Sequence, residues 1–124
     1  MKNDDIVKKL FIIGFLRGLI YVSIRGYLAP RYKTSPDWEN IKRVLFNTVQ
    51  RMPLDKYLDP ETQKTMIELL RKAEQNDEKA WRMFIKLARK IIIRNIKVFL
   101  KYIARDLKPN GTLLDFSDST KDCR

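Results

Sequence analysis

The sequence contains no histidine and only one cysteine, Cys123. One thiol cannot form a disulfide within the chain, so a disulfide-bonded scaffold is excluded. A zinc site built from cysteine and histidine is excluded as well, because such a site needs several of these ligands. Acid–base catalysis by histidine is ruled out for the same reason. A chain with so little cysteine fits a reducing compartment.

Long uncharged hydrophobic runs are also missing. The longest apolar stretch covers residues 10–24 and has Arg17 near its centre. A membrane-spanning helix needs about 20 predominantly apolar residues, and a central arginine is unfavourable there. The segment after it, IRGYLAPRY, offers no convincing cleavage site, so we expect no signal peptide. We interpret the stretch as a helix covered by protein, with membrane contact as the alternative.

Catalytic signatures are absent too. The chain has no Gly-rich phosphate loop, no dinucleotide-binding fingerprint and no Ser or Cys nucleophile arrangement. Acidic residues cluster only where helices are expected to begin, and the helix dipole explains them there. These residues are Asp55, Asp59, Glu61, Glu74, Asp77 and Glu78. We therefore expect no enzymatic activity, no cofactor and no metal site.

Positive charge is what the sequence has in excess. It contains 26 Lys and Arg against 15 Asp and Glu, which gives a formal net charge of +11. A charge of this size says little about the fold, but it favours a polyanionic partner, either nucleic acid or an anionic membrane. The hydrophobic content of 44% is high enough for a buried core.

Hydrophobic periodicity predicts four helices and no strand, so the predicted fold class is all-α. The expected helices cover about residues 3–28, 36–52, 60–74 and 77–107. Proline and capping residues set their ends, with a QND break before the last helix. Thr34 or Ser35 is the expected cap of the second helix, and Asp59 is that of the third. The second helix has one apolar face, formed by Trp38, Ile41, Leu45, Val49 and Met52. The predicted organisation is an N-terminal helical arm with a basic connector (1–35), a helical body (36–108) and a C-terminal tail (109–124).

The first expected helix is apolar around most of its circumference, with Asn3 or Asp4 as its cap. Three other helices of a chain this short cannot cover it, so a partner surface is expected. Gly14 and Gly18 have the G-xxx-G spacing that lets another helix approach closely. Two glycines that are merely tolerated are the alternative interpretation.

The last expected helix carries an unusual stripe of positive charge. At about 100° per residue, its Lys and Arg residues recur every three or four positions within one sector. The stripe consists of Arg82, Lys86, Lys90, Arg94, Lys97, Lys101, Arg105 and Lys108, with Arg89 at its border. The opposite arc is apolar except for Asn95. The sequence thus predicts one long amphipathic helix of about 45 Å.

An ordinary exposed helix face mixes charges, because opposite pairs at i,i+4 stabilise a helix and like pairs destabilise it. A polyanion along the stripe would convert this repulsion into attraction, and duplex DNA has one negative charge per about 1.7 Å of axis. A solvated face that only aids solubility is the alternative. Because the cations are spread evenly, the stripe favours phosphate contact without sequence preference.

Aromatic residues offer a weaker signal. Trp38 and Trp81 fall on apolar helix faces, where core packing is a better explanation than base stacking. Tyr21, Tyr27 and Tyr32 flank Arg25 and Arg31 in a segment that suits either nucleic-acid contact or an interface rim.

Several of these features occur together: an apolar N-terminal helix with sparse arginines (Arg17, Arg25), a basic proline-bearing connector (Arg31, Lys33) and a compact helical body. In this architecture the chain resembles the major coat proteins of filamentous and rod-shaped viruses of hyperthermophilic archaea. The resemblance implies that a helical arm clasps double-stranded DNA held in A-form. It also implies that many copies, often of two related proteins paired, wrap the genome as a helical filament.

On this resemblance, the first helix and connector would form the clasping arm, and the basic last helix would form a second DNA-facing surface. The arm is more hydrophobic than a DNA clamp requires, so it would pack on neighbouring subunits or meet a lipid envelope. The expected location is the virion, and otherwise the cytoplasm. The expected DNA-contacting residues are Arg17, Arg25, Arg31, Lys33, Arg82, Lys86, Arg89, Lys90, Arg94, Lys97, Lys101, Arg105 and Lys108.

Two other functions remain open on the sequence. The chain could be a small helical subunit of a ribonucleoprotein, such as an RNA-guided defence complex, which also uses basic helical faces. It could instead lie on an anionic membrane, with the amphipathic last helix on the lipid surface and the first helix dipping in.

Overall fold

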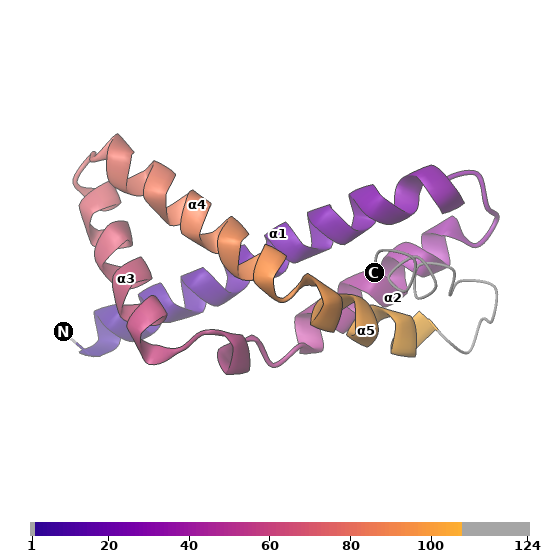
Figure 1. Cartoon of the computed structure of the whole chain (residues 1–124), viewed down its shortest axis with the longest axis horizontal. Helices are drawn as coiled ribbons and strands as arrows, with labels where there is room; N and C mark the ends of the chain where they lie inside the picture. Colours follow the sequence, from indigo (N-terminus) through magenta and orange to yellow (C-terminus); the bar gives the residue numbers. More distant parts are fainter. Residues whose placement is uncertain (1, 108–124) are drawn as a thin grey trace. The chain divides into compact units, whose positions relative to one another are not determined.

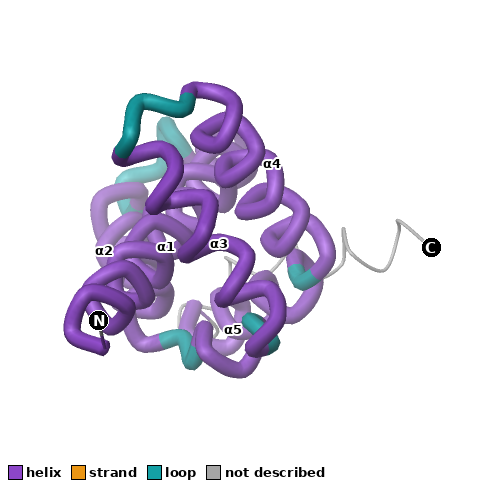
Figure 2. The backbone as a smooth tube through the Cα atoms, turned by 90° about the vertical axis from the view of Figure 1, so that its left-hand side faces the viewer, coloured by secondary structure: helices purple, strands orange, loops and turns teal. Residues whose placement is uncertain are grey.

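The computed structural model describes residues 2–107, and its regular structure there is entirely helical (Figures 1 and 2). The elements are α1 (Lys2–Tyr32), α2 (Trp38–Arg51), the 3-10 helix η1 (Leu54–Tyr57), α3 (Pro60–Glu74), α4 (Glu78–Arg94) and α5 (Ile96–Leu107). The predicted all-α class is confirmed. Lys108 and the predicted tail, 109–124, lie outside the described residues.

The chain divides into two compact units, and α1 contributes residues to both. The first unit contains residues 1–19 and 53–94, so it holds the start of α1 together with η1, α3 and α4. The second unit contains residues 20–52 and 95–124, with the rest of α1, α2 and α5 in its described part. The predicted extended N-terminal arm is therefore not confirmed.

The prediction of a single last helix is wrong. α4 ends at Arg94 and α5 begins at Ile96, with Asn95 as a turn between them. The Asn95 carbonyl accepts a hydrogen bond from the Phe99 amide (3.1 Å), so Asn95 stands at the position that starts α5. Asparagine is favoured there and disfavoured in helix interiors, because its side chain competes for backbone hydrogen bonds. The structure thus has five α-helices within residues 2–107, where the sequence predicted four.

The predicted connector between the first two helices is also shorter than expected. α1 continues through Pro30 to Tyr32, because the Lys33 amide still donates to the Ala29 carbonyl (2.9 Å) beyond the proline. α2 begins at Trp38 and not near residue 36. The expected cap from Ser35 takes a different form, since its Oγ accepts a hydrogen bond from the Asp37 amide (3.2 Å).

In the first unit, α3 and α4 form a tight helical hairpin. Asp59 caps α3 as predicted, with its side chain accepting a hydrogen bond from the Thr62 amide (2.6 Å) and proline at the next position. Asn76 ends α3 in the left-handed region (φ 66°), which asparagine tolerates better than most residues. Asp77 then caps α4 by accepting from the Ala80 amide (3.1 Å).

The first unit has an apolar core and ion pairs beside it. Its buried side chains include Ile12, Leu16, Met66, Phe84 and Ala88. Lys8 is 7% exposed and donates a hydrogen bond to Glu74, and this bond, aided by nearby Asp4, raises the pKa of the Lys8 amine above its ordinary value. Arg71, which like Glu74 is on α3, pairs with Asp5 of α1. These contacts fasten the start of α1 to α3.

In the second unit, α2 packs against α5. The predicted apolar face of α2 is confirmed, because Ile41, Leu45, Val49 and Met52 are buried and Trp38 is half-buried. A buried polar contact joins the two helices, in which Asp106 accepts hydrogen bonds from Thr48 Oγ1 (2.6 Å) and Arg51 (2.5 Å). The other core residues of this unit are Ile20, Ile24, Leu28, Phe99, Ile103 and Leu107.

Only one stripe of α1 is buried. Its buried residues recur every four positions, from Lys8 through Ile12 and Leu16 to Leu28. The expectation that α1 is covered on several sides is not met by residues 2–107. Five large apolar residues elsewhere on the helix are at least half exposed: Ile6, Val7, Leu10, Phe11 and Val22.

Candidate nucleic-acid interface

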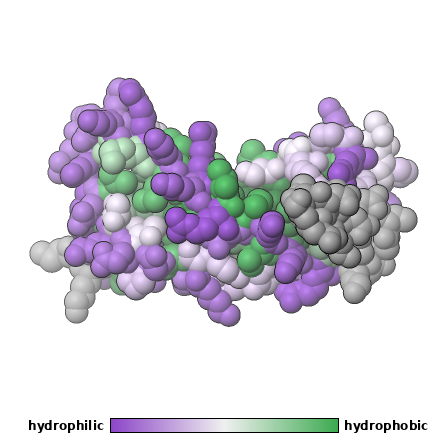
Figure 3. All heavy atoms as spheres, viewed as in Figure 1, coloured by the Kyte–Doolittle hydropathy of each residue, from purple (hydrophilic) through white to green (hydrophobic). Residues whose placement is uncertain are grey.

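The cations of α4 form one exposed face in the first unit. Their spacing of three and four residues follows the helical repeat, so they share a side of the helix over about 18 Å. Five of the six Lys and Arg residues of α4 were predicted to contact DNA, and they are defined here as the α4 face; all five are exposed: Arg82, Lys86, Arg89, Lys90 and Arg94. In the space-filling view, hydrophilic residues cover much of the surface over α3 and α4, with hydrophobic ones between them (Figure 3).

Few acids balance this face. Arg82 pairs with Glu78 at 3.5 Å, and Arg94 is close enough to Asp59 to help lower the pKa of that carboxyl. Within residues 2–107, no acid forms an ion pair with Lys86, Arg89 or Lys90. Among the described residues, the middle of the α4 face therefore has positive charge that no ion pair compensates.

Two exposed apolar residues lie within the cationic face, and the sequence analysis did not single them out. Ile93 is 71% exposed and Met83 is 51% exposed. By helical spacing Ile93 falls between Arg82 and Lys86 on the wheel, and Met83 falls between Lys90 and Arg94. An exposed isoleucine among cations suits contact with a sugar–phosphate backbone or with another protein surface.

The cations of α5 belong to the second unit. Lys97, Lys101 and Arg105 are exposed, and the Arg105 guanidinium lies 5.0 Å from the Tyr102 ring centroid. Because a turn at Asn95 separates α4 from α5, the predicted continuous stripe is two shorter helical faces. Its last predicted member, Lys108, lies outside the described residues.

The remaining predicted residues are on α1 and just after it. Arg25, Arg31 and Lys33 are exposed, whereas Arg17 is half-buried and already has an interaction within the chain. The Arg31 guanidinium lies 5.2 Å from the Tyr27 ring centroid. Arg17 is thus the weakest candidate for contact with a ligand.

A set of cation–aromatic pairs was not predicted as such. Besides the two arginine–tyrosine pairs, Lys42 lies 5.9 Å from the Trp38 ring centroid, and all three pairs are in the second unit. Stacking fixes the direction of a long cationic side chain on an exposed helix. Their sequence signal is a cation three or four residues after an aromatic residue, which places both on one helix face.

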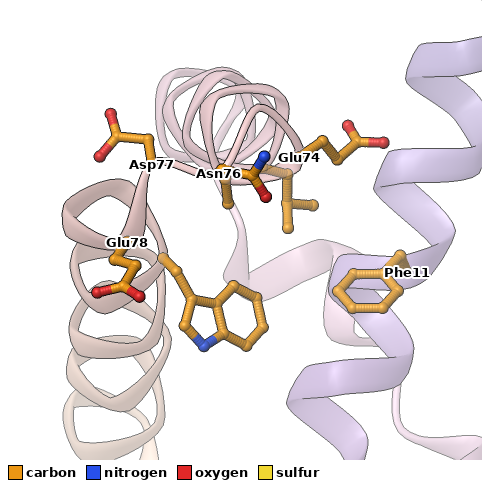
Figure 4. Close-up of a pocket in the computed structure, with 8 residues that line it drawn as sticks. Phe11, Glu74, Asn76, Asp77 and Glu78 are labelled. Atoms are coloured by element: carbon orange, nitrogen blue, oxygen red, sulfur yellow. The ribbon is translucent and has the colours of Figure 1, made fainter.

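The first unit also has an open cavity of about 430 Å³. Figure 4 shows Phe11 on one side of it and Glu74, Asn76, Asp77 and Glu78 on the other. Phe11 and Trp81 form apolar walls, and no Lys or Arg is among the lining residues. The cavity therefore combines aromatic walls with an acidic rim in a chain that is otherwise strongly basic.

Neither a metal site nor a membrane-spanning helix is found in the described part of the chain. No three acidic or thiol side chains there converge as they would around a metal ion. None of the helices described is long and apolar enough to cross a membrane. Comparison of the chain with protein-family models, curated proteins and solved structures gives no match.

Proposed function

We propose that this protein packages double-stranded DNA by binding the phosphate backbone without sequence preference. The observation that carries the proposal is the exposed α4 face, on which Lys86, Arg89 and Lys90 have no acidic partner among residues 2–107. A face of this kind destabilises its own helix through like-charge repulsion, and a row of phosphates would reverse that effect.

The even spread of the cations supports backbone contact over base recognition. Reading base edges requires a few Arg, Asn or Gln side chains grouped to enter a groove. On α4 and α5, Lys and Arg are mixed along exposed faces and no such group stands out. Contacts of this kind fix position on the duplex but do not distinguish sequences.

The more specific form of the proposal is a coat or nucleocapsid subunit of an archaeal virus, which assembles in many copies around its genome. Two features support it: the exposed cations on both units and the apolar surface that α1 leaves uncovered. The first suits DNA contact, and the second suits contact between subunits or with an envelope.

Neutralising three cations of the α4 face tests the proposal. The change is Lys86→Gln, Arg89→Gln and Lys90→Gln in one variant, with affinity for a short DNA duplex measured over a salt series. If the five α4 cations each neutralise one phosphate, log K falls with log[salt] at a slope of about −4.5. The variant should show a slope shallower by about 2.7, whatever the duplex sequence.

A matched control removes the same charge elsewhere in the first unit. Lys56→Gln, Lys64→Gln and Lys72→Gln change three exposed lysines that lie outside α4. This control should keep the wild-type slope. If the salt slope became equally shallow in both variants, only the net charge would matter, and this would contradict a binding face on α4.

The two alternative functions appear as outcomes of the same titration. Tighter binding to single-stranded RNA than to duplex DNA would favour a ribonucleoprotein subunit. Tight binding to anionic vesicles, together with an affinity for DNA that changes little with salt, would favour a protein that lies on a membrane surface. Either result would reject the packaging proposal.

A further inference from the structure

Ile93 is the most exposed large apolar side chain among residues 2–107, at 71%. Packing does not explain it, because a side chain so exposed buries little within the chain. Helix formation does not explain it either, because the branched Cβ makes isoleucine a weaker helix former than lysine or arginine. A face that only contacts phosphates would be served better by another cation. The position therefore favours an apolar contact with a partner outside residues 2–107.

Three cations surround Ile93 on the helix surface. Arg89 and Lys90 precede it by four and three residues and Lys86 by seven, so all share its side of α4. On the wheel, Ile93 lies about 40° from Arg89 on one side and about 60° from Lys90 on the other. None of the three cations forms an ion pair within residues 2–107. The arrangement is an apolar tip with uncompensated positive charge on both sides.

The minor groove of duplex DNA has the complementary arrangement. Two rows of phosphates border this groove, and the deoxyribose walls and base edges lie between them. The cations on the two sides of Ile93 match the two phosphate rows, and the isoleucine matches the space between the rows. The minor groove is about 6 Å wide, whereas a helix with its side chains is about 10–12 Å across. The helix itself therefore stays outside the groove, and only the tip of a side chain enters.

Charge and burial argue against other partners. A second copy of this chain has a net charge of +11, so the uncompensated cations of α4 would repel it. A helix that lies on a membrane inserts its continuous apolar face. On α4 that face belongs to the core, where Phe84, Ala88 and Ile91 are buried. Duplex RNA fits less well than DNA, because its minor groove is wide and shallow.

We propose that α4 lies across the minor groove of duplex DNA and that Ile93 inserts between two adjacent base pairs, so that the protein bends the DNA which it binds. Proteins that bind the minor groove commonly insert Phe, Leu, Ile or Met in this way, and the partly unstacked step kinks toward the major groove. The inference rests on the proposed function and adds a mechanism to it. Packaging requires such bending, because duplex DNA is stiff over about 150 base pairs.

Met83 is the other exposed apolar residue within the α4 face, at 51%. It precedes Ile93 by ten residues, which is about 15 Å along the helix axis. We assign the insertion to Ile93 because it is more exposed and because its branched side chain is stiffer than that of methionine. Met83 therefore provides a matched control on the same helix face.

The test measures bending and affinity separately. Energy transfer between fluorophores at the two ends of a short DNA duplex reports the bend, and affinity over a salt series reports the phosphate contacts. Wild type should bend the duplex by roughly 20–90°. Ile93→Ala should reduce the bend to less than about 20°, whereas Met83→Ala should leave it unchanged. Both variants keep every cation, so the salt slope should stay at the wild-type value.

Ile93→Lys gives the sharpest contrast between insertion and phosphate contact. The added cation should steepen the salt slope by about 0.9. The bend should nevertheless be lost, because placing a charged amine between base pairs removes it from water. All three variants should remain folded, since both positions are exposed and alanine and lysine are better helix formers than isoleucine. Circular dichroism checks this.

Three results would overturn the inference: wild type binds DNA but leaves it straight, Ile93→Ala bends DNA as wild type does, or Ile93→Ala and Met83→Ala lose the bend equally. So would binding to anionic vesicles that Ile93→Ala weakens while the duplex stays straight, because lipid would then be the partner. A straight duplex that still binds with the expected salt slope leaves the proposed function intact. If wild type does not bind duplex DNA at all, the proposed function fails and the inference fails with it.

Discussion

At the residue scale, single side chains at helix ends decide where each helix of the first unit begins and stops. Asp59 starts α3 by accepting a hydrogen bond from the Thr62 amide, and Asn76 ends it with a positive φ. The Asn76 amide donates to the Ala73 carbonyl (3.0 Å), and the Asp77 amide donates to the Lys72 carbonyl (3.2 Å). This pair of bonds closes the helix end in the Schellman arrangement. The turn is short because one residue ends α3 and the next caps α4.

The cap at Asp59 predicts a specific dependence on pH. The hydrogen bond from the Thr62 amide is the main reason why the pKa of the Asp59 carboxyl is lowered from its ordinary value of 3.8. A lowered folded-state pKa means that the ionised cap stabilises the protein fully above 3.8, and that this stabilisation is lost as the pH falls through the folded value. Asp59→Asn keeps a capping oxygen but has no such titration.

We therefore expect wild type and Asp59→Asn to differ in unfolding temperature by a constant amount near neutral pH. The difference should shrink once the pH falls below 3.8. Thermal unfolding followed by circular dichroism at a series of pH values measures the unfolding temperature of each protein. A difference that grows on acidification would contradict the cap, since the sign would then be that of a carboxyl with a raised pKa.

At the element scale, the pairing of α2 with α5 depends on one buried polar contact. Thr48 is 3% exposed and Asp106 is half-buried, whereas the Arg51 side chain is 68% exposed. The three residues do not contribute equally, because an ion pair with an exposed arginine contributes about 0–1 kcal/mol. The hydroxyl–carboxylate bond between Thr48 and Asp106 is shielded from water and should contribute more.

We expect Asp106→Ala to destabilise the protein by about 1–2 kcal/mol and Arg51→Ala by less than about 1 kcal/mol. The first value is limited because the Thr48 hydroxyl can still donate to the Val44 carbonyl, at 2.8 Å. Urea unfolding of the two single variants measures both values. A larger loss from Arg51→Ala than from Asp106→Ala would show that the ion pair, and not the buried hydroxyl bond, holds the helices together.

At the scale of the whole molecule, the net charge of +11 works against the folded state. Within residues 20–52 and 95–107, nine Lys and Arg stand against three acids, so the second unit is the more one-sided in charge. Self-repulsion of this kind weakens as salt screens it. The same repulsion should fall when the cations meet a polyanion, which links stability to the proposed function.

We expect the unfolding temperature to rise by several degrees between low salt and about 0.5 M NaCl, because screening adds about 1 kcal/mol to the stability. Differential scanning calorimetry over a salt series measures the rise. In the variant with Lys86, Arg89 and Lys90 changed to Gln, the unfolding temperature should rise less with salt, because part of the repulsion is already removed. A midpoint that falls with salt would mean that attractive ion pairs outweigh the repulsion.

Local chemistry in the sequence was enough to predict the all-helical class, the buried face of α2, the cap at Asp59 and the break before α4. Each of these depends on residues within one or two helical turns, so no distant contact is needed to specify it. The tertiary structure decided three other things. Asn95 divides the last helix, α1 buries one stripe and leaves apolar side chains such as Val7 and Leu10 exposed, and no acid in residues 2–107 forms an ion pair with Lys86, Arg89 or Lys90. An asparagine is compatible with either a helix interior or a helix start, and the packing of α5 residues such as Phe99 and Ile103 selects the start. Burial and charge pairing likewise depend on which segments, distant in the sequence, come together in each unit.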